Sequence, residues 1–253
     1  REATAEGLKI CGTEAALPAL LQALRDPVSG VRWRAAQALD ALKWQPESPV
    51  EEAWRWTALG EYEKAALQGA AGIDALALAT RDGVYYKRQA AIAALSLIGD
   101  ARVVKPVLAT LKDEDRNVRA TAIDALARIG DHAAVEPLIG ILGDGDPHVR
   151  SEAVGALSKL GDARAIGPLA GCLRDEHWEV REAAIRALGL FKDRSAVGPL
   201  VGALKDRDRE VREAAVRALM EIGDPAAVEA LVVTLKDEQD SVRALATTAL
   251  RRL

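Results

Sequence analysis

The side chains most capable of chemistry in this sequence are arginines that recur at a fixed place. Guanidinium groups bind phosphate and carboxylate in a planar, two-pronged geometry, so such a row could hold an anionic ligand. However, an aspartate stands six residues before the arginine in each complete unit, as in Asp113 and Arg119. This regular pairing favours a structural role over a phosphate site. The row consists of Arg1, Arg32, Arg88, Arg119, Arg150, Arg181, Arg212 and Arg243.

Other candidate reactive groups form no recognisable site. The three histidines, His132, His148 and His177, occupy different places in their units and match no metal-ligand spacing. Cys11 and Cys172 fall in helical positions typical of inert buried thiols. No Gly-rich phosphate-binding loop occurs in the sequence, and the repeated Gly-Asp pairs are typical of helix ends. We therefore predict no catalytic residue, no metal, no cofactor and no enzymatic activity.

The composition is that of a helical protein without a basic surface. The chain has 253 residues, and its 34 Lys+Arg against 38 Asp+Glu give a net charge of −4. Hydrophobic residues make up 49% but aromatic residues only 4%, which favours helices over sheets. The acidic balance argues against nucleic acid or an anionic membrane as partner. Two cysteines indicate a reducing compartment, so we expect a cytoplasmic location.

A 31-residue repeat dictates where these residues lie. Val-Arg recurs at Val118, Val149, Val180, Val211 and Val242. Apolar residues after each valine follow a helical period, Gly-Asp ends the helix, and a shorter proline-containing helix follows. The aspartate that closes each unit is expected to cap the next Val-Arg helix. One helix pair cannot bury its own apolar stripe, so the units must stack.

This pattern resembles the HEAT repeat family, in its short phycobilisome-lyase-like form. The resemblance implies an all-α, right-handed α-α superhelix, whose Val-Arg helices line the concave face. It also implies a ladder of Asp–Arg contacts between stacked units. We expect one solenoid over residues 1–253, truncated inside a repeat at both ends. The predicted ladder comprises Arg88, Arg119, Arg150, Arg181 and Arg212 with Asp82, Asp113, Asp144, Asp175 and Asp206.

Residues 44–68 interrupt the period and are predicted to form an extra helical hairpin in the second repeat. Ser48 to Glu51 reads as a capping box, with a helix ending at Gly60 and a second helix over 61–68. Two interpretations compete for the aromatic residues in and around this insertion. They fill a local core, which is favoured for Trp44 and Trp54, or they form a binding patch.

The residues two and six positions after each Val-Arg valine are expected to face away from the core. In the last units they include the self-pairing Glu182–Arg186 and Glu213–Arg217, which favours the N-terminal half as the binding region. The predicted partner-binding residues are Trp33, Gln37, Trp56, Tyr62, Tyr85, Tyr86, Gln89 and Trp178.

The leading functional hypothesis is a non-catalytic protein–protein interaction scaffold, the HEAT array of a larger multidomain protein. By analogy with similar arrays, that protein would carry signalling or effector domains. Its partner would be another protein or peptide, or a neighbouring domain of the parent chain. The alternative is a bilin-lyase-type accessory subunit that binds a tetrapyrrole or its acceptor protein. The HEAT-like enzyme deoxyhypusine hydroxylase binds iron through His-Glu dipeptides, which this sequence lacks. DNA binding of the kind seen in HEAT-like glycosylases is disfavoured by the mixed charges. The sparsely polar helix 242–253 also predicts either further repeats in the parent chain or end-to-end self-association.

Overall fold

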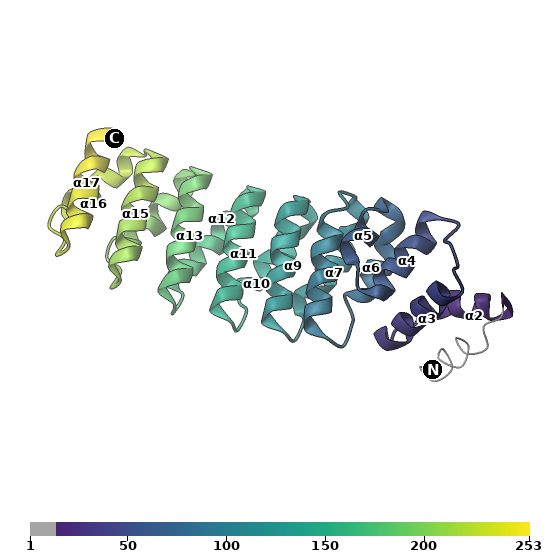
Figure 1. Cartoon of the computed structure of the whole chain (residues 1–253). Coiled ribbons are helices and arrows are strands. Elements are labelled where there is room, and N and C mark those ends of the chain that lie inside the picture. The colour runs from purple at the N-terminus through teal and green to yellow at the C-terminus, as the bar shows by residue number, and fades with distance from the viewer. Residues whose placement is uncertain (1–13) are drawn as a thin grey trace. The chain divides into compact units, whose positions relative to one another are not determined.

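The computed structural model describes residues 14–253, which are helical throughout and contain no strand. They fall into two compact units, Arg1–Ile129 (unit 1) and Gly130–Leu253 (unit 2). Predictions that concern Arg1 and Cys11 lie outside the described residues. Within each unit, helical hairpins stack in chain order, as Figure 1 shows, and the all-helical solenoid class predicted from the sequence is confirmed.

In unit 2 long helices alternate with short helices, and each short helix begins as a 3-10 turn. Neighbouring long helices contact one another, and each short helix packs against the long helix that follows it. The long helices are α11 (Pro147–Leu160), α13 (Trp178–Phe191), α15 (Arg209–Ile222) and α17 (Asp240–Arg252). The short helices with their turns are η5 (His132–Ala134) and α10 (Val135–Ile141), η6 (Ala163–Ala165) with α12 (Ile166–Gly171) and η7 (Cys172–Arg174), η8 (Arg194–Ala196) and α14 (Val197–Ala203), and η9 (Pro225–Ala227) and α16 (Val228–Thr234).

Unit 1 has the same plan with the insertion added. The long helix α7 packs against α9, while α4 contacts α3, α5 and α6, and α5 contacts α7. The described elements are η1 (Glu14–Ala16), α2 (Leu17–Ala23), α3 (Ser29–Ala41), α4 (Pro49–Leu59), α5 (Tyr62–Ala66), η2 (Gly69–Gly72), α6 (Ile73–Ala79), α7 (Tyr85–Ser96), η3 (Ala101–Val103), α8 (Val104–Ala109), η4 (Thr110–Lys112) and α9 (Arg116–Ile129).

The apolar stripe predicted from the repeat forms the core of each unit. In α11 the side chains of Val149, Ala153, Val154 and Leu157 are buried, and the matching residues of α13 and α15 are buried as well. These are mostly small aliphatic side chains, so the core holds layers of Ala, Val and Leu between closely spaced helices.

Glycine and aspartate separate the two helices of a repeat, as expected. Gly161 and Gly223 adopt the left-handed conformation, with φ of 65° and 68°, at the ends of α11 and α15. The aspartates that follow, Asp162 and Asp224, accept a hydrogen bond from the backbone N–H two residues on and so begin the next 3-10 turn. In α13 the same position is Lys192, which carries a φ of 52° without the conformational freedom of glycine.

The side-chain cap of α11 was predicted two residues too early, and α13, α15 and α17 have no side-chain cap. Asp144 accepts a hydrogen bond from the Asp146 N–H, outside the helix. It is Asp146 that caps α11, because its carboxylate accepts from the backbone N–H groups of His148 and Val149. The aspartate at the repeat boundary therefore shapes the loop before the helix.

The insertion forms the two helices predicted for it. Ser48 caps α4 by accepting from the Glu51 N–H, and Gly60 ends that helix with a φ of 84°. The Glu51 carboxylate accepts from the Glu47 N–H, one residue earlier than in a standard capping box. Trp44 and Trp54 are partly buried against the hydrophobic cluster between α2 and α3, as the core interpretation predicts.

One polar side chain of the insertion is buried without a hydrogen bond, which lowers the stability of the fold. Thr57 on α4 is only 2% exposed, and its hydroxyl has no hydrogen-bond partner among residues 14–253. Thr57→Val removes this hydroxyl while keeping the branched shape, so the free energy of unfolding should rise by about 1 kcal/mol. Urea denaturation of both proteins measures the change.

Thr110 is the matched control, because it is also buried but donates from its hydroxyl to the Val107 carbonyl at 2.7 Å. Thr110→Val should not stabilise the protein. Equal destabilisation by both substitutions would mean that the Thr57 hydroxyl has a partner after all.

Candidate functional site

Four of the ladder arginines each connect two successive loops of their own unit. Arg181 donates from Nε and Nη2 to the two carboxylate oxygens of Asp206, at 2.8 and 2.9 Å, and from Nη1 to the backbone carbonyl of Asp175 at 2.8 Å. The guanidinium thus fixes the loop before its own helix and the corresponding loop of the next repeat. The same arrangement joins Arg88 with Asp113 and Asp82, Arg150 with Asp175 and Asp144, and Arg212 with Asp237 and Asp206.

These arginines are not available to an outside anion. Arg88, Arg150, Arg181 and Arg212 are all buried, and a carboxylate already occupies the planar fork of each. Arg119 in unit 1 donates from Nη1 to the Asp113 carbonyl at 2.9 Å, which is the within-loop half of the same pattern.

The contact that spans the insertion is weaker than the others. Arg32 and Asp82 are separated by 50 residues instead of 25, and a single hydrogen bond of 3.1 Å joins Nη2 to Oδ2. The Nε of Arg32 is buried without a partner among the described residues. The inserted hairpin therefore changes the geometry with which the next loop meets this arginine.

Loss of one aspartate should weaken unit 2. Burial raises the pKa of Asp206, but hydrogen bonds from the Arg181 side chain and the Asp208 N–H outweigh it, so the pKa lies below the usual 3.8. The folded state favours the charged carboxylate, so Asp206 contributes fully to stability when the pH is above its usual pKa. This contribution is lost as the pH falls through the lowered pKa of the folded state. Asp206→Asn should cost about 2–3 kcal/mol of unfolding free energy at pH 7, because the buried Arg181 loses the carboxylate that binds both Nε and Nη2 and keeps only that of Asp208 on Nη2.

Denaturant titrations at pH 7 and at about pH 3 test this, because the difference between wild type and Asp206→Asn should shrink at the lower pH. Glu210→Gln serves as control: Glu210 pairs with Arg209 on the surface, and its loss should change stability little. If the difference in unfolding free energy between wild type and Asp206→Asn did not depend on pH, the proposed ion pair between Arg181 and Asp206 would be contradicted.

An exposed group of aromatic side chains lies on the long helices of unit 1. The exposed fractions are 45% for Trp33 on α3, 47% for Tyr85 and 58% for Tyr86, both at the start of α7. The two tyrosine rings meet edge to face with centroids 5.8 Å apart. The starts of α3 and α7 adjoin, because Lys87 Nζ lies 3.3 Å from the Ser29 hydroxyl, one turn before Trp33. We call Trp33, Tyr85 and Tyr86 the aromatic patch.

The predicted glutamines border this patch in different ways. Gln89 on α7 donates to the Asn117 carbonyl and to the Thr121 hydroxyl of α9, at 3.2 and 3.0 Å. Gln37, one turn after Trp33, is half-buried. Gln89 therefore links neighbouring long helices, while the aromatic patch remains the exposed part of the surface.

Two aromatic residues predicted to meet a partner are engaged within the protein instead. Tyr62 is only 9% exposed, and burial raises its pKa to about 12, so its assignment to a binding surface was wrong. Trp56 is half-buried and donates from its indole to Glu52. Cations of Arg55 and Lys64 lie 4.7 and 4.6 Å from its ring centroid, so the ring already has partners.

The long helices of unit 2 present mostly charged side chains at the corresponding positions. Arg186 and Arg217 donate to Glu182 and Glu213 one turn earlier, at 3.4 and 3.2 Å. A hollow of about 390 Å³ lies between these pairs and includes Leu190, an exposed apolar side chain that the sequence analysis missed. Trp178, at the start of α13, is 40% exposed.

The remaining candidate groups are consistent with a structural role. No cluster of three or more potential metal ligands occurs in residues 14–253. His132 Nδ1 lies 2.9 Å from Asp162, and Cys172 is a free, buried thiol whose pKa burial raises to about 11. Within the same residues, no helix has the length and apolar character to cross a bilayer.

Comparison with protein families decides the relationship. The family model for HEAT repeats matches residues 73–145, 132–184 and 168–251, which is more than half of the chain. This chain belongs to the HEAT repeat family. The single HEAT repeat model matches 16–42, and the PBS lyase HEAT-like repeat model matches 1–26.

Solved structures share this HEAT-type fold. An engineered protein is 25% identical with a TM-score of 0.55, covering 76% of this chain and 96% of its own. A designed armadillo repeat protein in complex with the peptide (KR)4 is 23% identical with a TM-score of 0.54, covering 70% and 97%. Kap95p, in a structure with RanGDP, is 17% identical with a TM-score of 0.60, covering 92% of this chain and 39% of its own. No curated protein matches this chain.

Proposed function

We propose that this HEAT repeat protein is a non-catalytic scaffold that binds a protein or peptide segment through the aromatic patch of unit 1. The observation that supports this proposal is the exposure of three aromatic side chains, Trp33, Tyr85 and Tyr86, on the long helices α3 and α7. Trp and Tyr supply large contact areas with few rotatable bonds, and they dominate the energy of protein interfaces.

The surroundings of the patch support a peptide or protein ligand. The carboxylates of Asp40 and Asp124, on α3 and α9, are held by Arg55 and Arg128 at 2.7 Å in both cases. A partner that covers the rings therefore meets little unpaired negative charge. The indole N–H of Trp33 and the tyrosine hydroxyls add hydrogen-bonding groups at the patch.

The wider setting is part of the same proposal. The array would belong to a larger multidomain protein and work in the cytoplasm, with no reaction performed by its own side chains. The family resemblance leaves a bilin-lyase-type accessory subunit as the alternative. That alternative predicts a changed visible spectrum when the protein is mixed with a bilin.

A random-peptide display library, selected on the wild-type protein, provides a test. Peptides that bind the aromatic patch should lose at least about tenfold in affinity for the Trp33→Ala, Tyr86→Ala double variant, since each interface anchor contributes more than about 1 kcal/mol. Fluorescence anisotropy of the selected peptides measures the loss.

The double variant Trp178→Ala, Leu190→Ala is the control, because it removes exposed apolar side chains from unit 2 while leaving unit 1 intact. Its affinity for the same peptides should stay close to that of wild type. The proposal would be wrong if no peptide were enriched, or if the Trp33, Tyr86 variant bound the enriched peptides as well as wild type does.

We propose a second contact surface on α16 and α17 that receives a hairpin of the same repeat type from a second copy of the chain. Val228 and Leu235 are both 37% exposed, although the matching Val197 and Leu204 one repeat earlier are 7% exposed. Arg243 donates from Nη1 to the carbonyls of Asp237 and Glu238 and from Nη2 to Asp240 of its own helix, whereas the matching Arg212 pairs with an aspartate of the next repeat. The surface thus resembles the stacking interface of the preceding repeats. It includes an arginine that could donate to an aspartate of the second copy.

Sedimentation velocity over a range of protein concentrations tests this contact. Wild type should associate as its concentration rises, and Val228→Ser, Leu235→Ser should lower the associated fraction, because apolar area that the contact would bury is lost. Leu190→Ser should leave association unchanged. A wild-type protein that stays monomeric throughout would refute the contact.

A further inference from the structure

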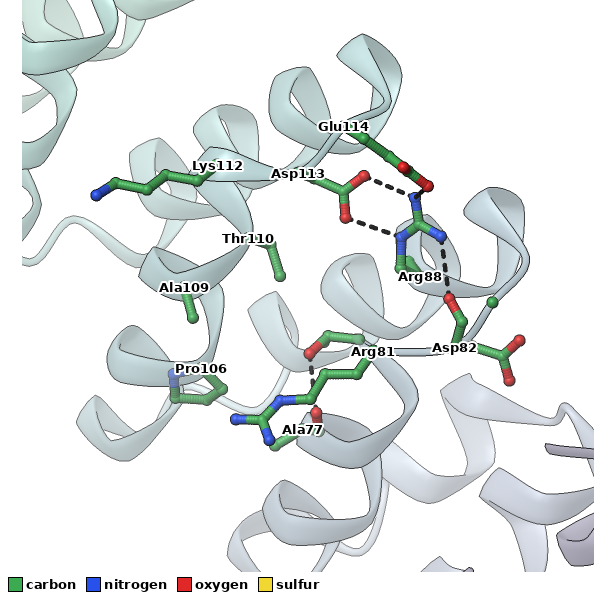
Figure 2. A pocket seen from close by; sticks show the side chains of 12 residues that line it. Ala77, Arg81, Asp82, Arg88, Pro106, Ala109, Thr110, Lys112, Asp113 and Glu114 are labelled. Carbon is green, nitrogen blue, oxygen red and sulfur yellow. Dashed lines mark hydrogen bonds and ion pairs between the residues drawn. The ribbon is translucent and has the colours of Figure 1, made fainter. Parts of the chain in front are cut away.

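A second kind of pocket recurs in both units, between the ends of successive short helices. In unit 2 it has a volume of about 800 Å³ and lies between α12 and α14. In unit 1 it has a volume of about 520 Å³ and lies between α6 and α8 (Figure 2). We call them the short-helix pockets. Their walls include residues one repeat apart, such as Arg174 and Lys205 in unit 2 and Arg81 and Lys112 in unit 1.

The two cations of each pocket have no partner in the part of the chain that the structure describes. Arg174, Lys205, Arg81 and Lys112 are all exposed, and no hydrogen bond or ion pair engages their side chains within residues 14–253. In Figure 2, the Arg81 guanidinium and the Lys112 ammonium extend to the same side of the pocket, away from the Arg88–Asp113 contact. Each pocket therefore presents two unpaired positive charges to solvent.

The carboxylates of the unit 2 pocket do not cancel these charges. Asp206 is the only acidic side chain in its wall, and both of its oxygens accept from Arg181. In unit 1, Asp82 and Asp113 are held by Arg32 and Arg88, but the exposed Glu114 also belongs to the wall. The electrostatic attraction for an anion is therefore stronger in unit 2.

The unit 2 pocket also has room for a side chain between its cations. An added Cβ at Gly171, Gly198 or Gly202 would meet no other atom within 4 Å, and none of the three has a positive φ. Neither the backbone conformation nor close packing explains these glycines, although glycine is unfavourable within a helix. A cation near a helix C-terminus is favoured by the helix dipole, but this interaction needs no open pocket beside it.

We infer that the short-helix pockets bind the carboxylate side chains of an acidic peptide segment, and that the unit 2 pocket binds them more tightly. Glutamate or aspartate side chains along an extended segment could pair with Arg174 and Lys205 in turn. Nucleic acid is the less suitable polyanion, because the wall of the unit 2 pocket holds no aromatic side chain on which a base could stack. This inference is independent of the aromatic patch, which lies on the long helices of unit 1.

A fluorescein-labelled peptide of ten glutamates, followed by fluorescence anisotropy at low ionic strength, tests the pocket. The double variant Arg174→Gln, Lys205→Gln should bind the peptide about tenfold more weakly, as expected for the loss of two exposed ion pairs. Gly202→Leu should also weaken binding without any change of charge, because its side chain would occupy the open space.

The matched control is Arg186→Gln, Arg217→Gln, which removes the same charge from the long helices of unit 2. Its affinity should remain near that of wild type. Failure of wild type to bind the peptide, or equal losses in the two double variants, would overturn the inference. So would tighter wild-type binding of a ten-nucleotide thymidine strand than of the glutamate peptide.

The Trp33→Ala, Tyr86→Ala variant separates the two proposals. It should bind the ten-glutamate peptide as wild type does, even though it loses the peptides selected on the aromatic patch. Loss of the glutamate peptide in this variant would place the acidic ligand on the long helices and contradict the pocket assignment.

Discussion

The repeat depends on the buried arginine that joins two loops. A guanidinium removed from water needs every donor satisfied, and here one edge binds the next aspartate while the third nitrogen binds a backbone carbonyl. Both partners must lie at fixed distances along the chain, six residues before the arginine and 25 residues after it. The 31-residue period is the sum of these two constraints. A residue added to or lost from either loop would leave a buried charge without its partner.

The insertion is the one place among the described residues where this constraint is relaxed. Moving the next aspartate to 50 residues after Arg32 leaves a single hydrogen bond and a buried Nε without a partner. The hairpin provides other contacts in return, since α4 packs against α3 and α5 packs against α7. It also brings Tyr62 close to Arg32, Asp82 and Tyr86. The most irregular packing of unit 1 thus lies directly beside its exposed aromatic residues.

Sequence periodicity explains which features could be predicted. The helices, the glycines that end them and the buried apolar stripe could be predicted because the same residue types recur at the same positions. A pattern seen in several repeats is better supported than one that occurs once. Tyr62 was misplaced because the insertion occurs once, and an aromatic residue there fits a core as well as a surface. Trp56 was also ambiguous, since its cation partners Arg55 and Lys64 become neighbours only through the hairpin. The short-helix pockets were missed because glycines and unpaired cations, taken singly, look like ordinary surface residues.

A repeat held together in this way leaves particular surface positions free to differ. The arginine contacts and the aliphatic stripe stabilise each unit, so the residue types two and six positions after the valine can differ from one repeat to the next. They read Trp33 and Gln37 in α3 but Glu182 and Arg186 in α13. Charges that pair within one helix satisfy each other and offer little to a ligand. Exposed aromatic rings remain incompletely covered until another molecule buries them. The same scaffold can therefore carry one surface that is inert and another that binds, without any change in the interactions that fold it.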